Sequence, residues 1–212
     1  MSPDSPLFPL AIAITDFGES SVLLPTAILA SGWFWISHHR RLAIIWLVTV
    51  GGCALSMMAF KLIFLTCGRY LLGEMVQTPS GHTAISMLFY GAAALTIGRL
   101  SPATARHRAV ILVSALGFAL AIGVSRILIH AHTPGEVIIG FMVGSAWLAI
   151  FAFMLRQSDR ELGMPPLAVM LTLAVIYGGL LTVSMAGRHM SVEGYLRHVA
   201  WVLHHRLDVC TG

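Results

Sequence analysis

Charged side chains are scarce in this chain. Only 10% of its 212 residues are Asp, Glu, Lys or Arg, whereas 57% are hydrophobic, and the mean hydropathy is +0.84. A soluble domain carries about 25% charged residues, so a chain this poor in charge cannot cover its own surface with polar groups. The composition excludes a water-soluble globule and indicates one domain embedded in a membrane.

Cysteine and lysine are also rare, and each shortage excludes a class of function. The three cysteines, Cys53, Cys67 and Cys210, have no metal or redox spacing and predict no disulfide framework. Of the 13 basic residues, 12 are arginines that are scattered between apolar runs. Because the net charge of +4 is spread in this way and forms no basic tract, we expect no nucleic-acid partner.

Six apolar runs predict helices that cross the membrane, which needs about 20 residues for each crossing. They cover residues 20–37, 42–65, 83–98, 109–124, 137–155 and 167–185. The third and fourth runs have only 16 residues each, so we expect these helices to extend beyond them. We predict an all-α fold, a polytopic six-helix transmembrane bundle that forms a single domain over residues 1–186. Residues 187–212 have apolar residues at helical spacing and predict a C-terminal amphipathic helix at the membrane interface.

The arginines also predict an orientation. Alternation of the helices places loops 38–41, 99–108 and 156–166 on one side, and these loops hold seven arginines. The opposite side holds both termini and six basic residues, three of which lie in or near the polar clusters described next. Without those three the bias is seven to three, which indicates that the arginine-rich loops are cytoplasmic. We expect a multi-pass protein of the cytoplasmic (inner) membrane.

Two polar clusters interrupt the apolar chain on the predicted non-cytoplasmic side. The first, residues 78–83, stands where the third span begins, so that Ser80 can cap the helix and Gly81 lets a ligand approach the backbone. A helix N-terminus of this kind favours an anion. In the second cluster, Thr133, Pro134 and Glu136 have the spacing of a capping box. A second helix N-terminus is therefore expected on the same side.

Two further cations belong to this side. Lys61 lies near the end of the second span and Arg69 follows it, and a lysine inside a membrane is costly enough to indicate a function. Together with Arg126, His82 and His132, they offer positive charge for a phosphoryl group and two groups able to exchange protons. This set indicates phosphoryl-transfer chemistry without a metal site.

The same residues carry a family resemblance. The run Pro79-Ser80-Gly81-His82 and the pattern Ser125-Arg126-x5-His132-x3-Glu136, preceded by Lys61 and Arg69, resemble the three motifs of the type 2 phosphatidic acid phosphatase (PAP2) superfamily. The resemblance covers about residues 61–144. It implies a six-helix membrane bundle that hydrolyses lipid phosphates or diphosphates without a metal or other cofactor.

The resemblance also implies a role for each motif residue. His132 is the implied nucleophile, which forms a phosphohistidine, His82 the general acid for the leaving group, and Glu136 the group that orients His132. The residues implied to hold the phosphate oxygens are Lys61, Arg69, Ser80, Gly81 and Arg126. The chain departs from the family at two places. Seven residues instead of six separate Lys61 from Arg69, which is followed by Tyr70 where Pro is usual, and Glu136 replaces the usual Asp.

Other interpretations compete with this one. A capping box alone explains Glu136, although both roles are compatible. The chain has ten histidines, but no cysteine or carboxylate completes a metal-ligand set with His130 and His132. The spacing of Gly140 and Gly144 is typical of a helix-packing face. The rival function is a membrane bundle that binds or transports a lipid headgroup without catalysis, but anion binding alone needs no second histidine.

The sequence leaves the substrate open among several lipid phosphates. Polyprenyl diphosphate, phosphatidate, phosphatidylglycerophosphate and lipid A all fit the implied chemistry. We expect membrane lipids as the partners of the chain.

Overall fold

The computed structural model describes residues 7–72, 78–100, 102–157 and 166–186, and within these ranges every regular element is a helix. The helices are α1 (Leu7–Asp16), α2 (Ser20–Ile36), α3 (Arg40–Leu72), α4 (Gly81–Leu100), α5 (Pro102–Ala105), α6 (Arg108–Leu128), α7 (Pro134–Arg156) and α8 (Pro166–Ala186). The predicted all-α fold class is confirmed. The predicted C-terminal amphipathic helix, residues 187–212, lies outside the described residues.

Five segments of the described chain are long and apolar enough to cross a membrane, which makes this a multi-pass membrane protein. They are Leu7–Ile36, Arg40–Thr66, Gly81–Leu100, Arg108–Leu128 and Pro134–Arg156. As expected, the two short apolar runs extend at both ends, and α4 with 20 residues is about 30 Å long. The sixth predicted span corresponds to α8, which extends one residue beyond it at each end.

The structure differs from the sequence prediction in one helix boundary and in one additional helix. Helix α3 continues to Leu72, so residues 68–72 are helical where a loop was expected. Nothing in Gly68 to Leu72 stops a helix, because a single glycine only weakens it. Helix α1 was not expected at all, since its ten residues are too short to cross a bilayer alone.

Helix α1 packs against α6 and is fixed there by polar and aromatic contacts. Thr15 Oγ1 and Ser125 Oγ are 2.9 Å apart and share a hydrogen bond. Just beyond α1, Tyr90 donates its hydroxyl proton to the carbonyl oxygen of Phe17 at 2.9 Å, and the rings of both residues pack on Phe118. These contacts hold α1 and Phe17 beside α6.

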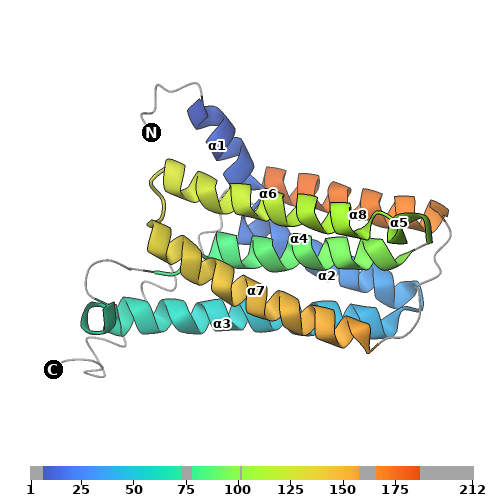
Figure 1. The fold of residues 1–212 in the computed structure, drawn as a ribbon, viewed down its shortest axis with the longest axis horizontal. Helices are drawn as coiled ribbons and strands as arrows, with labels where there is room; N and C mark the ends of the chain where they lie inside the picture. Colours follow the sequence, from blue (N-terminus) through green and yellow to red (C-terminus); the bar gives the residue numbers. More distant parts are fainter. Residues whose placement is uncertain (1–6, 73–77, 101, 158–165, 187–212) are drawn as a thin grey trace.

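Helix α4 is the centre of the bundle. It packs against α2, α3, α6 and α7, and Figure 1 shows it running through the middle of the molecule. In the most apolar 18-residue stretch of α4, 67% is buried inside the protein, against 22% in the corresponding stretches of α6 and α7. A helix surrounded in this way has little freedom to shift, so the residues at its ends are held firmly in place.

The two ends of the bundle differ in chemistry. At one end α3 and α6 finish, α4 and α7 begin, and both polar clusters are found there (Figure 1). The opposite end carries the arginine-rich turns, and its core is an aromatic cluster around Trp46. The Trp46 ring lies 5.5 Å from that of Phe89 and 5.6 Å from that of Phe151, both edge to face. These rings join α3, α4 and α7.

The expected glycine packing face of α7 lies directly on α4. A Cβ atom added to Gly140 would come within 2.5 Å of the carbonyl oxygen of Ser80, and one added to Gly144 would collide with the carbonyl oxygen of Ala84. Because the obstacles are backbone atoms, they cannot rotate away. The two glycines therefore fix how closely α7 approaches the first turn of α4.

We expect Gly144→Ala to lower the melting temperature in detergent. The added methyl group forces α7 away from Ala84, and overpacking of this kind costs about 1–3 kcal/mol. Gly117→Ala is the matched control, because its added Cβ meets nothing within 4 Å. A Gly144→Ala protein as stable as the Gly117→Ala protein would contradict the close contact.

Candidate active site

The site begins with the first turn of α7. Thr133 is the N-cap residue, and its hydroxyl accepts a hydrogen bond from the Glu136 backbone N–H at 3.3 Å. The Glu136 carboxylate in turn accepts a bond from the Thr133 N–H at 3.0 Å, and Pro134 occupies the first helical position. The capping box predicted from the sequence is confirmed.

The same carboxylate has two further partners. Its Oε2 atom is 2.8 Å from Nδ1 of His132, and its Oε1 atom accepts a hydrogen bond from the Thr78 backbone N–H at 2.9 Å. Only 6% of the His132 side chain and 5% of the Glu136 side chain are exposed, so bulk water screens their interaction little. Glu136 is therefore both a helix cap and the partner of His132.

The first turn of α4 is tied to the same residue. The Ser80 backbone N–H donates to the carbonyl oxygen of Glu136 at 3.1 Å, and the Ser80 carbonyl accepts from Ala84 as that of an N-cap residue does. Ser80 occupies the predicted capping position, while its hydroxyl accepts a hydrogen bond from Thr83 Oγ1 at 2.9 Å. The N-termini of α4 and α7 thus lie side by side.

The end of α6 places His132 through its backbone. His130 has a φ of 57° and ends the helix in a Schellman motif, in which the Ala131 N–H reaches the carbonyl oxygen of Arg126 at 3.0 Å. The His132 N–H donates to the same oxygen at 3.2 Å. His130 is exposed and serves here as a helix cap, unlike His132 two residues later.

His38 plays the same role as a helix cap at the other end of the bundle. Its φ is 65°, and the next residue, His39, donates its N–H to the carbonyl oxygen of Phe34 at 2.8 Å. Two of the ten histidines are thereby explained as left-handed helix caps. Within the described ranges, no three His, Cys, Asp or Glu side chains come together as a metal site.

The cations complete the cluster. The positive charges of Lys61 and Arg126 act on both His82 and His132, and His132 also acts on His82. Lys61 Nζ lies 3.9 Å from the point where a Cβ on Gly81 would stand. The ammonium group therefore faces the backbone at the start of α4, where a phosphate would meet free N–H groups.

Burial lowers the pKa of His132 below its ordinary value of 6.5, and the hydrogen bond and charge of Glu136 oppose that shift while Arg126 and Lys61 add to it. At neutral pH the imidazole is therefore uncharged. Since the Glu136 carboxylate can only accept, the single ring proton stays on Nδ1, and Nε2 keeps a free lone pair. That lone pair is what a nucleophile requires.

Seven of the eight predicted site residues come together here, namely Lys61, Ser80, Gly81, His82, Arg126, His132 and Glu136. The eighth, Arg69, lies in α3, and its side chain is outside the described residues. The sequence placed Thr78 and Thr83 in the first polar cluster without indicating a role for either, and it did not indicate the contact of Gly140 with Ser80. No sequence pattern marks Thr78, because its contribution is a backbone N–H. The spacing of Ser80 and Thr83 on one turn was a signal for the hydroxyl pair.

The model of the PAP2 superfamily matches residues 62–161. A protein described as an uncharacterized 22.5 kDa protein in cps region, from Klebsiella pneumoniae, is 32% identical over 148 residues, which cover 68% of this chain and 69% of that protein. The chain belongs to the PAP2 superfamily. PAP2 superfamily members are phosphatases, and membership together with the apolar helices fits a membrane phosphatase. No solved structure matches the chain.

We expect Glu136→Gln to lower kcat by at least about 100-fold, in line with the loss seen when the carboxylate of a catalytic triad becomes an amide. The amide keeps one acceptor oxygen, and its NH₂ group must face one of the three N–H donors that the carboxylate now accepts. Because Glu136 raises the pKa of His132, its loss lowers that pKa further, so the acid limb of the kcat/KM profile should move to lower pH.

Thr133→Ala is the matched control for this change. It removes a cap worth about 1 kcal/mol but keeps the carboxylate. We expect a lower melting temperature and an acid limb at its wild-type pH. If Glu136→Gln changes stability as Thr133→Ala does and leaves the acid limb in place, Glu136 is only a cap.

Proposed function

We propose that the protein is an integral membrane phosphatase that hydrolyses a lipid phosphate or diphosphate without a metal, through a phosphohistidine on His132. The observation that carries the proposal is the 2.8 Å bond between His132 Nδ1 and Glu136, in a cluster that also holds His82 and two cations. A site that only bound an anion would need the cations but neither the oriented imidazole nor the second histidine.

The proposed first step is an attack by Nε2 of His132 on phosphorus. A nitrogen–phosphorus bond forms and the bond from phosphorus to the leaving oxygen breaks. His82, which is protonated when the anionic substrate is bound, gives that oxygen its proton. The imidazole becomes positively charged as it reacts, and the carboxylate of Glu136 stabilises that charge through Nδ1–H. The Glu136 side chain thus acts most strongly after the reaction has begun.

In the proposed second step, water attacks the phosphohistidine. His82, now neutral, accepts a proton from the water, phosphate leaves, and Nε2 of His132 regains its lone pair. The two steps return each group to its starting state and consume only water. Every proton transfer is assigned to His82, so no metal ion is required to activate the water.

The negative charge of the phosphoryl group needs compensation in both steps. Lys61 and Arg126 are the proposed cations, and the N–H of Gly81 with the hydroxyl of Ser80 are the proposed hydrogen-bond donors at the N-terminus of α4. Arg69 is proposed as a third cation on the family resemblance alone. Such preorganised donors stabilise the transition state without moving during the reaction.

The proposed substrates are membrane lipids that end in a phosphate or a diphosphate. A panel of polyprenyl diphosphate, phosphatidate, phosphatidylglycerophosphate and lipid A separates the alternatives that the sequence leaves open. The proposed location is the cytoplasmic (inner) membrane, with the site on the non-cytoplasmic side. This orientation is supported by the arginine-rich turns at the opposite end of the bundle.

We expect the purified protein to release phosphate from a short-chain lipid phosphate in detergent with excess chelator, and His132→Ala to abolish that release. Rapid quenching of the wild type should trap an acid-labile phosphoenzyme, because phosphohistidine is the proposed intermediate. His130→Gly is the matched control, since glycine adopts a φ of 57° freely and His130 has no proposed catalytic role. Absence of release from every lipid on the panel would favour the headgroup-binding or transporting alternative.

The orientation has its own test by cysteine labelling. In a protein whose native cysteines are replaced, we expect a membrane-impermeant maleimide to reach Ala131→Cys in intact cells but Ala103→Cys only after permeabilisation. Both positions are exposed, one beside His132 and the other at the arginine-rich end. The reverse pattern would invert the proposed topology.

A further inference from the structure

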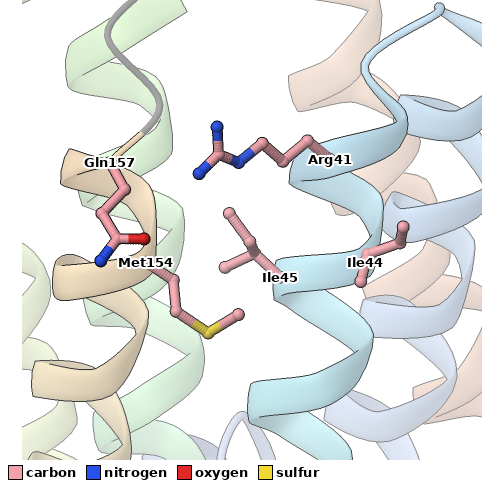
Figure 2. A pocket seen from close by; sticks show the side chains of 5 residues that line it. All are labelled: Arg41, Ile44, Ile45, Met154 and Gln157. Carbon is pink, nitrogen blue, oxygen red and sulfur yellow. The ribbon is translucent and has the colours of Figure 1, made fainter.

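A cavity of about 270 Å³ opens at the arginine-rich end of the bundle, between the start of α3 and the end of α7. It is lined by Arg41, Ile44, Ile45, Met154 and Gln157 (Figure 2). Along α7, Gln157 is about 30 Å from Glu136 at 1.5 Å per residue. The cavity is therefore separate from the proposed active site.

The walls and the mouth of the cavity differ in polarity. Ile45 is 2% exposed and forms the buried wall, to which Ile44 and Met154 add apolar surface. Figure 2 shows the Arg41 side chain extending from α3 across the gap toward α7, where Gln157 carries its amide group. A cationic group above an apolar wall matches a molecule with an anionic head and a hydrocarbon tail.

Two neighbouring arginines, Arg40 and Arg99, already have partners within the protein. The guanidinium carbon of Arg40 lies 5.4 Å from the ring centroid of Trp35, and Arg99 donates a hydrogen bond to the carbonyl oxygen of Leu155 at 2.6 Å. Arg40 thus covers the end of α2, and Arg99 caps the end of α7. Arg41 is the arginine that lines the cavity.

The level of the cavity also fits a lipid. Helix α3 begins at Arg40 and α7 ends at Arg156, so the mouth lies where the spans meet the polar boundary of the membrane. Lipid phosphates stand at this level, and basic pockets between membrane helices are suited to anionic headgroups.

We propose that this cavity binds an anionic glycerophospholipid from the leaflet at the arginine-rich end. Its phosphate is held by Arg41 and the Gln157 amide, and its first acyl carbons lie against Ile45 and Met154. None of the five lining side chains is a nucleophile or a proton donor for hydrolysis, so the lipid is a bound ligand and not a substrate. The proposal is independent of the proposed phosphatase activity.

The test is thermal unfolding of the full chain in detergent during titration with lipid. Phosphatidylglycerol should raise the melting temperature to a plateau, because a ligand of the folded state stabilises it by mass action. Phosphatidylcholine with the same acyl chains, and glycerol phosphate without them, should not. Arg41→Gln should weaken the apparent affinity for phosphatidylglycerol by about fivefold, as expected for about 1 kcal/mol from one cation.

Arg106→Gln is the matched control. Arg106 is an exposed arginine at the same end of the bundle, is bonded to His107 and lies outside the cavity, so its loss should leave the affinity unchanged. Met154→Trp provides a second variant that fills the apolar wall and keeps the charge. It should also weaken binding, and Arg41→Gln decides alone if the tryptophan variant does not fold.

Several results would overturn the proposal. Equal stabilisation by phosphatidylcholine would show that the acyl chains alone raise the melting temperature. Stabilisation by glycerol phosphate would show that a free anion is sufficient. Equal losses in Arg41→Gln and Arg106→Gln would show a diffuse effect of charge, and no stabilisation by any lipid would show that the cavity binds none. Arg41→Gln should release phosphate at the wild-type rate, so this test and that of the proposed function fail separately.

Discussion

The carboxylate of Glu136 holds the site end of the molecule together. It accepts hydrogen bonds from the backbone N–H groups of Thr78 and Thr133 and contacts the imidazole of His132. The backbone carbonyl oxygen of Glu136 also accepts a hydrogen bond from the Ser80 N–H. An ionised carboxylate that is 5% exposed is costly unless donors surround it. The donors come from segments far apart in the chain, so this charge is compensated only in the folded bundle.

The local part of this arrangement was predictable from the sequence. The capping box and the helix N-termini follow from residues three or four positions apart, and apolar length alone locates α4, α6 and α7. The bond from Thr78 to Glu136 spans 58 residues and uses a backbone donor, so side-chain chemistry does not indicate it. Helix α1 was not predicted because its apolar run is short. Its position depends on contacts with Ser125 and Phe118 of α6, which are far away in the sequence.

Two histidines also have a structural role that the sequence did not predict. In the sequence His38 stands beside His39 and His130 two residues from His132, spacings that invite a metal interpretation, yet both His38 and His130 end a helix with a positive φ. This conformation is normally left to glycine or asparagine, so the residue type gave no indication of it. His132 was singled out because its spacing to Arg126 and Glu136 records where one helix ends and the next begins, and the structure places its imidazole beside Glu136.

The length of the residue 136 side chain has a consequence for how relatives of this protein can vary. Glutamate spans the gap between the start of α7 and the backbone at Thr78, and an aspartate ends one carbon earlier. Gly140 already brings α7 into contact with the Ser80 carbonyl, so the helices have no space left in which to close that gap. A relative with aspartate at this position must therefore place the segment before α4 differently. The length of the side chain at position 136 and the path of residues 78–80 therefore depend on one another.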